Sequence, residues 1–191
     1  MNSRWHARIR HAGDFSFMQN IEFKAELRNL EAARQQCRLL GAQPGGRLHQ
    51  RDTYFRMTDG RLKKRETEGQ AVQWVYYHRP DRVSPRMSNY TILTDAQAKR
   101  RWGTRSLRPW LVVEKTRDLW LLGDVRIHID EVNDLGAFLE FEALVSRRFG
   151  VKACHEAIAR LRESFTPLMG EPISASYSDL LHQQMADSTT S

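Results

Sequence analysis

The sequence predicts an α+β fold in which an eight-stranded antiparallel β-barrel carries helices packed outside it. Three observations support this prediction. About eight segments alternate polar and apolar residues, or are rich in β-branched and aromatic types, as strands are. Helical patterns are inserted between some of these segments, without the regular alternation that accompanies a parallel sheet. Five of the strands carry charged residues on one face, which a closed barrel would turn inward.

Residues 19–27 are predicted to form the first strand, because every second side chain is apolar. The following residues change to helical spacing, with Asn29 as the N-cap and Gly41 as the stop signal. The Pro-Gly-Gly sequence at residues 44–46 then predicts a loop.

Two strands at residues 49–57 and 61–66 surround a Thr-Asp-Gly turn and are predicted to form a hairpin. Residues 71–79 are rich in aromatic and β-branched types and predict another strand. Residues 80–90 are expected to be a loop, and residues 94–102 a short helix with a Thr-Asp cap.

The second half of the chain contains further predicted strands, at residues 111–117, 118–122, 125–132 and 138–145. A helix is expected from about Lys152 to Phe165, where apolar residues recur at helical spacing. The barrel domain is therefore predicted to span residues 19–182. Residues 183–191 are expected to be a polar tail, and residues 1–18 a disordered basic leader without the apolar segment of a secretory signal.

The composition narrows the class of protein. The chain has 191 residues, with 30 Lys and Arg against 23 Asp and Glu, and a formal net charge of +7. Such an excess favours a polyanionic partner. No apolar run approaches the roughly 18 residues of a membrane span, so an integral membrane protein is excluded. The two cysteines, Cys37 and Cys154, are too sparse for a disulfide framework and predict buried thiols in the cytoplasm.

Charged or polar residues recur at every second position on five strands. They are Asn20, Glu22, Lys24 and Glu26; Arg61, Lys63 and Arg65; Lys115 and Arg117; Arg126, His128 and Asp130; and Glu140 and Glu142. On a single strand such a face is typical of a solvated sheet surface. On five strands it indicates a charged concave interior. Since cations bind phosphate oxygens and clustered carboxylates bind Mg²⁺ or Mn²⁺, the pattern predicts a metal–polyphosphate site.

Several short motifs resemble those of the CYTH superfamily, which is named for class IV adenylate cyclases and thiamine triphosphatases and is also called the triphosphate tunnel metalloenzymes. The family's opening Glu-x-Glu-x-Lys signature corresponds to residues 20–24, Asn-Ile-Glu-Phe-Lys. Further matches lie at residues 52–55, 60–66, 77–81, 88–90, 113–117, 126–132, 135–142 and 176–181. The resemblance implies an eight-stranded tunnel that binds a nucleoside or inorganic triphosphate together with Mg²⁺ or Mn²⁺.

Carried over by position, the resemblance implies three groups of site residues. The substrate-binding group is Lys24, Lys63, Arg65, Arg79, Lys115, Arg117 and Arg126. The metal-binding group is Glu22, Asp130, Glu140 and Glu142. The catalytic group is Glu22, Lys24, Arg117 and His128, in which His128 or a carboxylate accepts a proton. A structural histidine bonded to a carboxylate explains His128 equally well.

Two features depart from the family pattern. Asn20 replaces the first signature Glu, which removes a charge although an amide oxygen still coordinates metal. In the strand at 71–79, simple alternation groups His78 with Trp74 and Tyr76, where the family often has an inward Lys. Arg79 would then face inward only with a β-bulge.

The resemblance is compatible with two reactions. In the cyclase reaction, which the sequence favours narrowly, the ribose 3′-hydroxyl of ATP attacks the α-phosphate and pyrophosphate leaves. In the hydrolase reaction, water attacks the terminal phosphate of thiamine triphosphate or inorganic tripolyphosphate. The cyclase interpretation rests on the motifs at 77–81, 88–90 and 126–130. It also rests on Trp74, Tyr76 and Tyr77, which either stack a base or pack in the core.

A third alternative is a non-enzymatic binder of nucleic acid or polyphosphate. It rests on a basic run with interleaved tryptophans: Lys99, Arg100, Arg101, Arg105 and Arg108 with Trp102 and Trp110. A solvated face near the tunnel mouth explains this run as well, and the inward carboxylates argue against a nucleic-acid module. The oligomeric state is left open, with a homodimer as one option.

Overall fold

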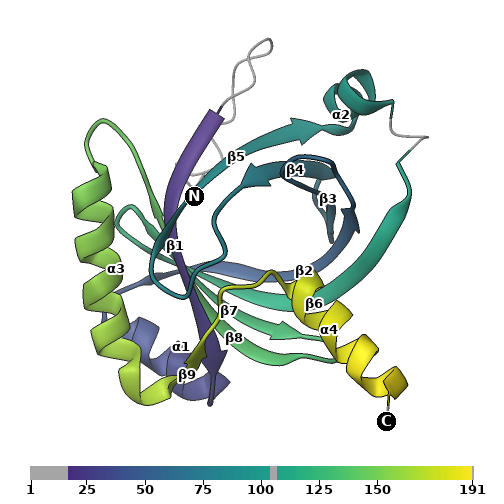
Figure 1. The fold of residues 1–191 in the computed structure, drawn as a ribbon. Coiled ribbons are helices and arrows are strands. Elements are labelled where there is room, and N and C mark those ends of the chain that lie inside the picture. Colours follow the sequence, from purple (N-terminus) through teal and green to yellow (C-terminus); the bar gives the residue numbers. More distant parts are fainter. Residues whose placement is uncertain (1–16, 104–106, 191) are drawn as a thin grey trace.

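The computed structural model describes residues 17–103 and 107–190 (Figure 1). The strands are β1 (Phe17–Leu27), β2 (Gln43–Phe55), β3 (Arg61–Thr67), β4 (Gln73–His78), β5 (Arg86–Thr94), β6 (Pro109–Leu122), β7 (Val125–Val132), β8 (Gly136–Leu144) and β9 (Met169–Pro172). The helices are α1 (Leu30–Leu39), α2 (Asp95–Trp102), α3 (Val151–Phe165), the short 3-10 helix η3 (Thr166–Leu168) and α4 (Tyr177–Thr190).

Eight antiparallel strands form a closed barrel. Their order is β5-β4-β3-β2-β6-β7-β8-β1, and β5 pairs back to β1 to close the ring. The short strand β9 is added to the C-terminal end of β1, where Ala25 and Leu27 lie beyond the residues that β5 engages. The predicted α+β fold with an eight-stranded antiparallel barrel is confirmed.

The apolar core lies between the barrel wall and two helices. The apolar face of β1, with Ile21 and Phe23 almost fully buried, points outward from the barrel together with the apolar faces of β7 and β8. Helices α1 and α3 cover this wall, and α3 contributes Ile158 and Phe165 to the same core (Figure 1). Because the helices take the apolar side, the charged side of each strand is left for the interior.

The predicted helix signals are present in the structure. The Asn29 side chain accepts a hydrogen bond from the amide of Ala32 at 2.9 Å, and Gly41 follows α1 with a φ of +74°. Thr94 and Gln97 form a reciprocal capping box at the start of α2. Both cysteines are buried free thiols, as the sequence predicted.

Three predicted boundaries are wrong. Residues 86–90, expected in a loop, begin strand β5, whose inward residues are polar and so lack the apolar pattern of a strand. The Pro-Gly-Gly segment at 44–46 lies inside β2, where the register shifts to accommodate it. The two segments predicted at 111–117 and 118–122 form one continuous strand, β6, because no turn residue separates them.

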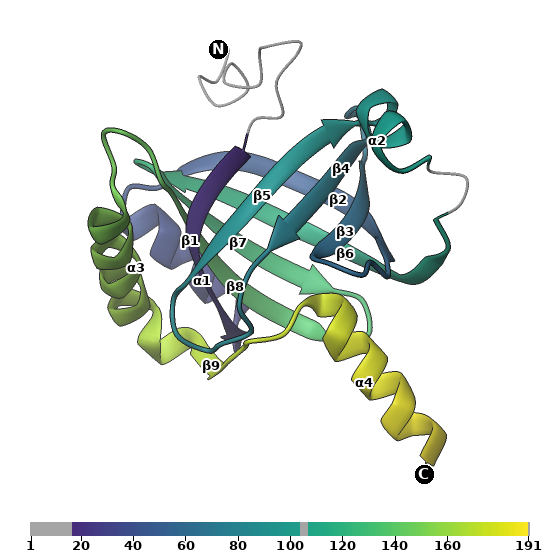
Figure 2. The same cartoon turned by 45° about the horizontal axis from the view of Figure 1, so that its top comes forward.

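Two elements were not expected from the sequence. Strand β9 borders β1, and helix α4 runs through most of the segment predicted as a polar tail, with exposed side chains over its second half. Figure 2 shows α4 leaving the end of the barrel opposite to that at which β1 begins. The predicted basic leader lies outside the described residues up to residue 16, and Phe17 and Met18 belong to β1.

None of the described helices has the length and apolar character needed to cross a membrane. The cytoplasmic location and the homodimer stay predictions.

A stability measurement tests the position of the core. Ile158 on α3 is fully buried, whereas Val151 on the same helix is 39% exposed. We expect Ile158→Ala to lower the free energy of unfolding by about 2–5 kcal/mol, since it leaves a cavity, and Val151→Ala to change it by no more than about 0.5 kcal/mol. Urea unfolding followed by circular dichroism gives both values, and equal effects would contradict the placement of α3 on the barrel wall.

Candidate active site

Ionisable side chains fill the barrel interior. Among the described residues, the inward cations are Lys24, Lys63, Arg65, Arg79, Arg86, Lys115, Arg117 and Arg126. The inward carboxylates are Glu22, Asp52, Asp130, Glu140 and Glu142. The structure therefore brings together every sequence-predicted site residue.

Strand register stacks these side chains in layers along the barrel. The layers are Glu22, Glu142 and Arg126; then Lys24, Glu140 and His128; then Phe138, Asp130 and Arg117. Side chains within a layer are cross-strand neighbours, which places them within reach of one another.

The third layer is organised around Asp130, which has no solvent exposure. Arg117 donates two hydrogen bonds of 2.6 Å to its two oxygens, and Lys115 donates a third at 3.3 Å. The hydroxyl of Tyr177, the first residue of α4, donates a fourth at 2.8 Å. The oxygens of Asp130 are thus occupied by protein donors, which suits a residue that positions Arg117 more than a metal ligand.

In the second layer, Glu140 lies between three donors. Arg117 donates to it at 3.0 Å, His128 Nδ1 lies 3.1 Å from the same oxygen, and the Lys24 Nζ is 3.7 Å from the other. The ammonium of Lys24 also lies 3.8 Å from the ring centroid of Tyr177, a cation–π contact.

The first layer is less completely paired. Arg86 and Arg79 both contact the Oε1 atom of Glu22, at 3.0 and 3.3 Å. Glu142 lies 3.7 Å from Arg126, beyond hydrogen-bond range, and no hydrogen bond reaches it within the described part of the chain. The Oδ1 atom of Asn20, 3% exposed and next to this layer on β1, is buried without a partner.

A separate ion-pair cluster lies on β2 and β3. Arg65 donates two hydrogen bonds to Asp52, at 2.7 and 2.6 Å, and Lys63 donates a third at 2.9 Å. Asp52 is 1% exposed. It holds the two predicted phosphate-binding residues of β3 side by side.

Burial and neighbouring charges shift the pKa values of the interior bases. Burial, reinforced by Arg117, lowers the pKa of Lys115 to about 7 although Asp130 opposes the change. Burial, with a contribution from Arg65, lowers the pKa of Lys63 to about 8. Burial and Arg117 also lower the pKa of His128, which favours its neutral form near pH 7.

The carboxylates divide into two groups. Burial alone would raise the pKa of Asp52, but Arg65 and Lys63 outweigh it and hold that pKa well below its usual range. The pKa of Glu140 is likewise held well below its usual range, by Lys24, His128 and Arg117. The pKa of Glu22 is instead raised, because burial and repulsion from Glu140 outweigh its two arginine neighbours.

One group of donors could hold a divalent ion. His128, Glu140 and Glu142 each offer a ligand atom, and these atoms lie within 4.8 Å of one another. Imidazole nitrogen and carboxylate oxygen are both donors that divalent ions accept. The unpartnered amide oxygen of Asn20 adds a further donor close by, so the residues present fit such an ion.

Three residues of the site were not singled out for a role by sequence reasoning. Asp52 was visible only as part of a matched motif. Arg86, 1% exposed and opposite Glu22, lay in the expected loop, although Arg86, Ser88 and Tyr90 alternate as a strand would. Tyr177, like Asp52, was visible only as part of a matched motif, at residues 176–181, and only the structure places its hydroxyl on Asp130.

The expected orientation of β4 is wrong. Trp74 packs in an outer cluster beneath α2 and donates to Asp95 at 2.9 Å, and Tyr76 lies beside Trp102. The inward face instead carries Tyr77 and, directly after the strand, Arg79, which needs no bulge to reach Glu22. The pairing with β3 explains this orientation. Lys63, which faces inward, lies opposite Val75, so Val75 and Tyr77 share the inward face and Trp74 and Tyr76 point outward.

The basic run expected near the tunnel mouth lies on α2 and the segment after it. Lys99, Arg100 and Arg101 are exposed, and the guanidinium of Arg101 lies over the rings of Tyr76 and Trp102. Arg105 falls outside the described residues. These basic residues therefore lie on the outside of the barrel, away from the carboxylates in its interior.

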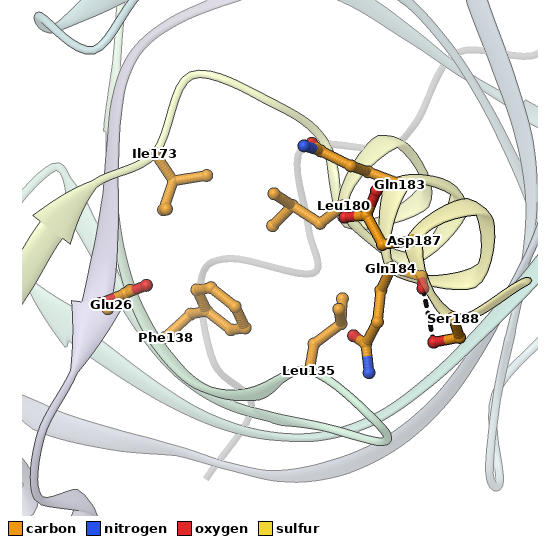
Figure 3. Close-up of a pocket in the computed structure, with 9 residues that line it drawn as sticks. All are labelled: Glu26, Leu135, Phe138, Ile173, Leu180, Gln183, Gln184, Asp187 and Ser188. Atoms are coloured by element: carbon orange, nitrogen blue, oxygen red, sulfur yellow. Dashed lines mark hydrogen bonds between the residues drawn. The ribbon is translucent and has the colours of Figure 1, made fainter. Parts of the chain in front are cut away.

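Two cavities of about 480 Å³ lie near α4. Figure 3 shows the first, between α4 and the end of the barrel, with Phe138, Leu180 and Ile173 on its apolar side. The second is lined by Tyr77, Arg79 and their neighbours. It adjoins the ion-pair site, because Arg79 reaches Glu22.

A family profile described as CYTH domain matches residues 18–177. A search of curated proteins found no match.

Similar solved structures include a protein of Pyrococcus horikoshii OT3, which is 21% identical with a TM-score of 0.69 over 84% of this chain and 98% of that one. A candidate adenylate cyclase from Vibrio parahaemolyticus is 16% identical, with a TM-score of 0.68 over 85% and 97%. A candidate adenylyl cyclase from Hippeastrum, described as having a dominant triphosphatase activity, is 14% identical, with a TM-score of 0.55 over 87% and 96%. At these identities the likeness establishes the fold.

The lowered pKa of Lys115, about 7, predicts that anion binding takes up protons. A polyanion beside the ammonium raises its pKa again, so between pH 7 and 9 the lysine gains a proton on binding and affinity falls as pH rises. Calorimetry with inorganic tripolyphosphate at pH 8, in two buffers of different ionisation enthalpy, measures this uptake.

The ligand itself can also exchange protons on binding, so the wild type is compared with the Lys115→Arg variant, whose side chain stays charged. We expect it to take up roughly one proton fewer than the wild type, whereas Lys64→Arg, on the outer face of the same sheet, matches the wild type. Equal proton counts for Lys115→Arg and wild type would contradict the prediction.

Proposed function

The chain belongs to the CYTH domain family, and on this premise we propose that it is a metal-dependent enzyme that hydrolyses a triphosphate inside the barrel. The premise supplies the class of site.

The observation that carries the proposal is the balance of charge inside the barrel. Eight inward cations, each named above, face five carboxylates, which leaves a surplus of three positive charges when all are ionised. Arg61, on the same face of β3, is left out of this balance because it pairs with Asp81 and Asp179 instead of these carboxylates. A triphosphate that carries one divalent ion has a net charge of about −2 to −3 near neutral pH. Such a ligand would neutralise the interior.

Four of the interior cations are held by two buried carboxylates, and the others border the first layer. Asp52 positions Lys63 and Arg65, and Asp130 positions Lys115 and Arg117. Each guanidinium and ammonium retains donors beyond those that its carboxylate uses. We assign these four residues to the phosphate chain. Lys24, Arg79 and Arg126, which border the more open first layer, complete the predicted substrate-binding group.

Glu22 is the group we assign as proton acceptor. Its raised pKa makes it a better proton acceptor than an ordinary carboxylate, and its Oε2 atom makes no hydrogen bond within the described residues. In the proposed step, the oxygen of a water molecule bonds to the terminal phosphorus and the bridging P–O bond breaks. The electron pair stays on the departing diphosphate, and the proton of the water passes to Glu22.

Lys24 and Arg117 would stabilise the charge that develops on the phosphoryl oxygens, because both are buried where electrostatic interactions are strong. A bound Mg²⁺ or Mn²⁺ supplies further charge neutralisation and bridges phosphate oxygens. Glu142 would hold this ion through an oxygen that no cation occupies closely, whereas Glu22, which the sequence also placed in the metal-binding group, is assigned the proton. Asp130 and Glu140, which the sequence placed in the same group, are engaged by cations and would orient their neighbours.

Hydrolysis is preferred over cyclisation because two of the three aromatic residues considered for base stacking face away from the interior. Trp74 and Tyr76 lie in the outer cluster near α2. A cyclase must hold a nucleoside as well as its phosphates, whereas a hydrolase needs only the phosphate chain and water.

An ATP-cyclising activity is kept as a second candidate because of one observation. Tyr77 is buried on the inner face and lines the cavity of about 480 Å³ that also includes Arg79, His78 and Asn89. A nucleoside placed there would have an aromatic ring, an amide and a guanidinium around it, and its phosphates would reach Glu22 and the first layer.

Product identification distinguishes the candidates. The protein is incubated with tripolyphosphate, thiamine triphosphate or ATP, each with Mg²⁺ or Mn²⁺, and the products are identified by mass spectrometry. We expect orthophosphate from tripolyphosphate or thiamine triphosphate, and a loss of roughly 10²–10³-fold in rate for Glu142→Gln. Glu114→Gln, on the exposed outer face of β6, is the matched control and should keep full activity.

Cyclic AMP from ATP would select the second candidate. Binding of nucleic acid without turnover, or full activity in Glu142→Gln, would contradict the proposed site.

The Asn20→Glu substitution tests the departure from the family signature. It returns a carboxylate next to Glu22, so we expect the dissociation constant for Mn²⁺ to fall by about tenfold, since an added anionic ligand strengthens a hard-cation site. Isothermal titration calorimetry measures the change. An unchanged constant would mean that position 20 does not contribute to the ion.

A further inference from the structure

We infer that His128 binds the divalent ion directly through its Nε2 atom, and that the site therefore selects a first-row transition ion such as Mn²⁺ over Mg²⁺. The inference rests on the proposed function only for the presence of an ion in the barrel. It adds a nitrogen ligand to a site that the family resemblance describes with carboxylates.

The orientation of the imidazole is fixed by Glu140. His128 Nδ1 lies 3.1 Å from Glu140 Oε2, and that carboxylate also accepts a hydrogen bond from Arg117 at 3.0 Å. A carboxylate held by cations accepts hydrogen bonds, so the proton of the neutral ring belongs on Nδ1. The lone pair is then on Nε2. A histidine oriented in this way by a carboxylate is a common feature of metal sites.

The Nε2 atom faces a carboxylate at a separation that a hydrogen bond does not explain. Glu142 Oε2 lies 4.0 Å from Nε2, which exceeds the range of a hydrogen bond. Two ligand atoms bonded at about 2.0–2.2 Å to opposite sides of one ion lie about 4.0–4.4 Å apart. The pair is therefore spaced to share an ion.

Two oxygen-bearing side chains at this place, those of Glu142 and Asn20, are without hydrogen-bond donors among the described residues. Glu142 has Arg126 at 3.7 Å and no hydrogen bond within the described part of the chain, and Glu22 lies directly opposite it on β1. The Oδ1 atom of Asn20, two residues before Glu22, is buried and unpartnered. A buried acceptor without a donor is costly unless a ligand satisfies it. An ion and its bound water would satisfy Asn20 as well as Glu142.

The choice of ion follows from the donor atoms. Mg²⁺ is a hard cation that prefers oxygen and retains water, whereas imidazole nitrogen strengthens binding of first-row transition ions. A site of one nitrogen and several oxygens therefore favours Mn²⁺ over Mg²⁺. Ions later in the series, such as Co²⁺, are expected to bind more tightly still.

Electron paramagnetic resonance on the full chain tests the inference without an activity assay. The loss of the free Mn²⁺ signal on titration gives a dissociation constant, and added Mg²⁺ gives the relative affinity. Spin-echo envelope modulation detects ¹⁴N bonded to the ion. We expect nitrogen modulation in the wild type, with Mn²⁺ alone or with Mn²⁺ and tripolyphosphate.

Two substitutions accompany the measurement. His128→Gln should abolish the nitrogen modulation and weaken Mn²⁺ binding by roughly 10–100-fold, with less than about threefold effect on Mg²⁺, since Mg²⁺ gains little from nitrogen. His49→Gln is the control, because His49 contacts Thr116 on the outer face of the barrel and should behave as wild type. Because the wild-type modulation is informative by itself, misfolding of His128→Gln does not remove the test.

The outcomes separate this inference from the proposed function. Nitrogen modulation that persists without any triphosphate turnover would support the ligand and overturn the function. Turnover with Mn²⁺ bound and no nitrogen modulation would overturn the ligand and support the function. Absence of Mn²⁺ binding in both conditions, or an equal affinity for Mg²⁺ and Mn²⁺, would also overturn the inference.

Discussion

The carboxylate of Asp130 is buried without solvent contact, and the barrel is arranged to satisfy it. A buried charge is tolerated only when its partners are close and its lone pairs are filled, because the loss of hydration costs several kcal/mol for each ion. Arg117 on β6, Lys115 on the same strand and Tyr177 on α4 all donate to it. These bonds join two neighbouring strands and the last helix at one end of the barrel. The position of α4 thus depends on the same interaction that orients the principal guanidinium of the interior.

The interior separates along its length into a saturated end and an open end. Toward α4, Asp130 has four donors, and on β2 and β3 Asp52 has three. At the other end, around Asn20 and Glu142, donors and acceptors lack partners. Saturated ion pairs hold side chains in place, whereas unpartnered groups are available to a ligand. The net charge of +7 therefore has two parts: one part is the positive surplus inside the barrel, and another is the group of α2 cations, which face outward.

Sequence reasoning succeeded where one face of a strand is apolar and the other charged. In β1, Ile21 and Phe23 alternate with Glu22 and Lys24, and both the strand and its two faces follow directly from the period. Sequence reasoning failed for β5. Its inward residues Arg86 and Ser88 are polar, so the start of the strand lacks the apolar alternation that predicts one, although β4 and β1 both pair with it. Tyr177 was beyond prediction for another reason: a contact between residues 47 positions apart depends on the closed barrel and has no local pattern.

The asparagine at position 20 affects the charge of the first layer, to which it is adjacent on β1. Asn20 removes one negative charge from the end of the barrel where Glu22 and Glu142 already face each other. Adjacent carboxylates repel, and the raised pKa of Glu22 reflects burial together with such repulsion. A neutral amide keeps an oxygen donor without adding to this repulsion. A neutral imidazole at His128 has the same property, since burial and Arg117 keep its pKa low. The open end thus combines two carboxylates with two neutral donors, which leaves the positive surplus of the interior available for the phosphate chain of the proposed substrate.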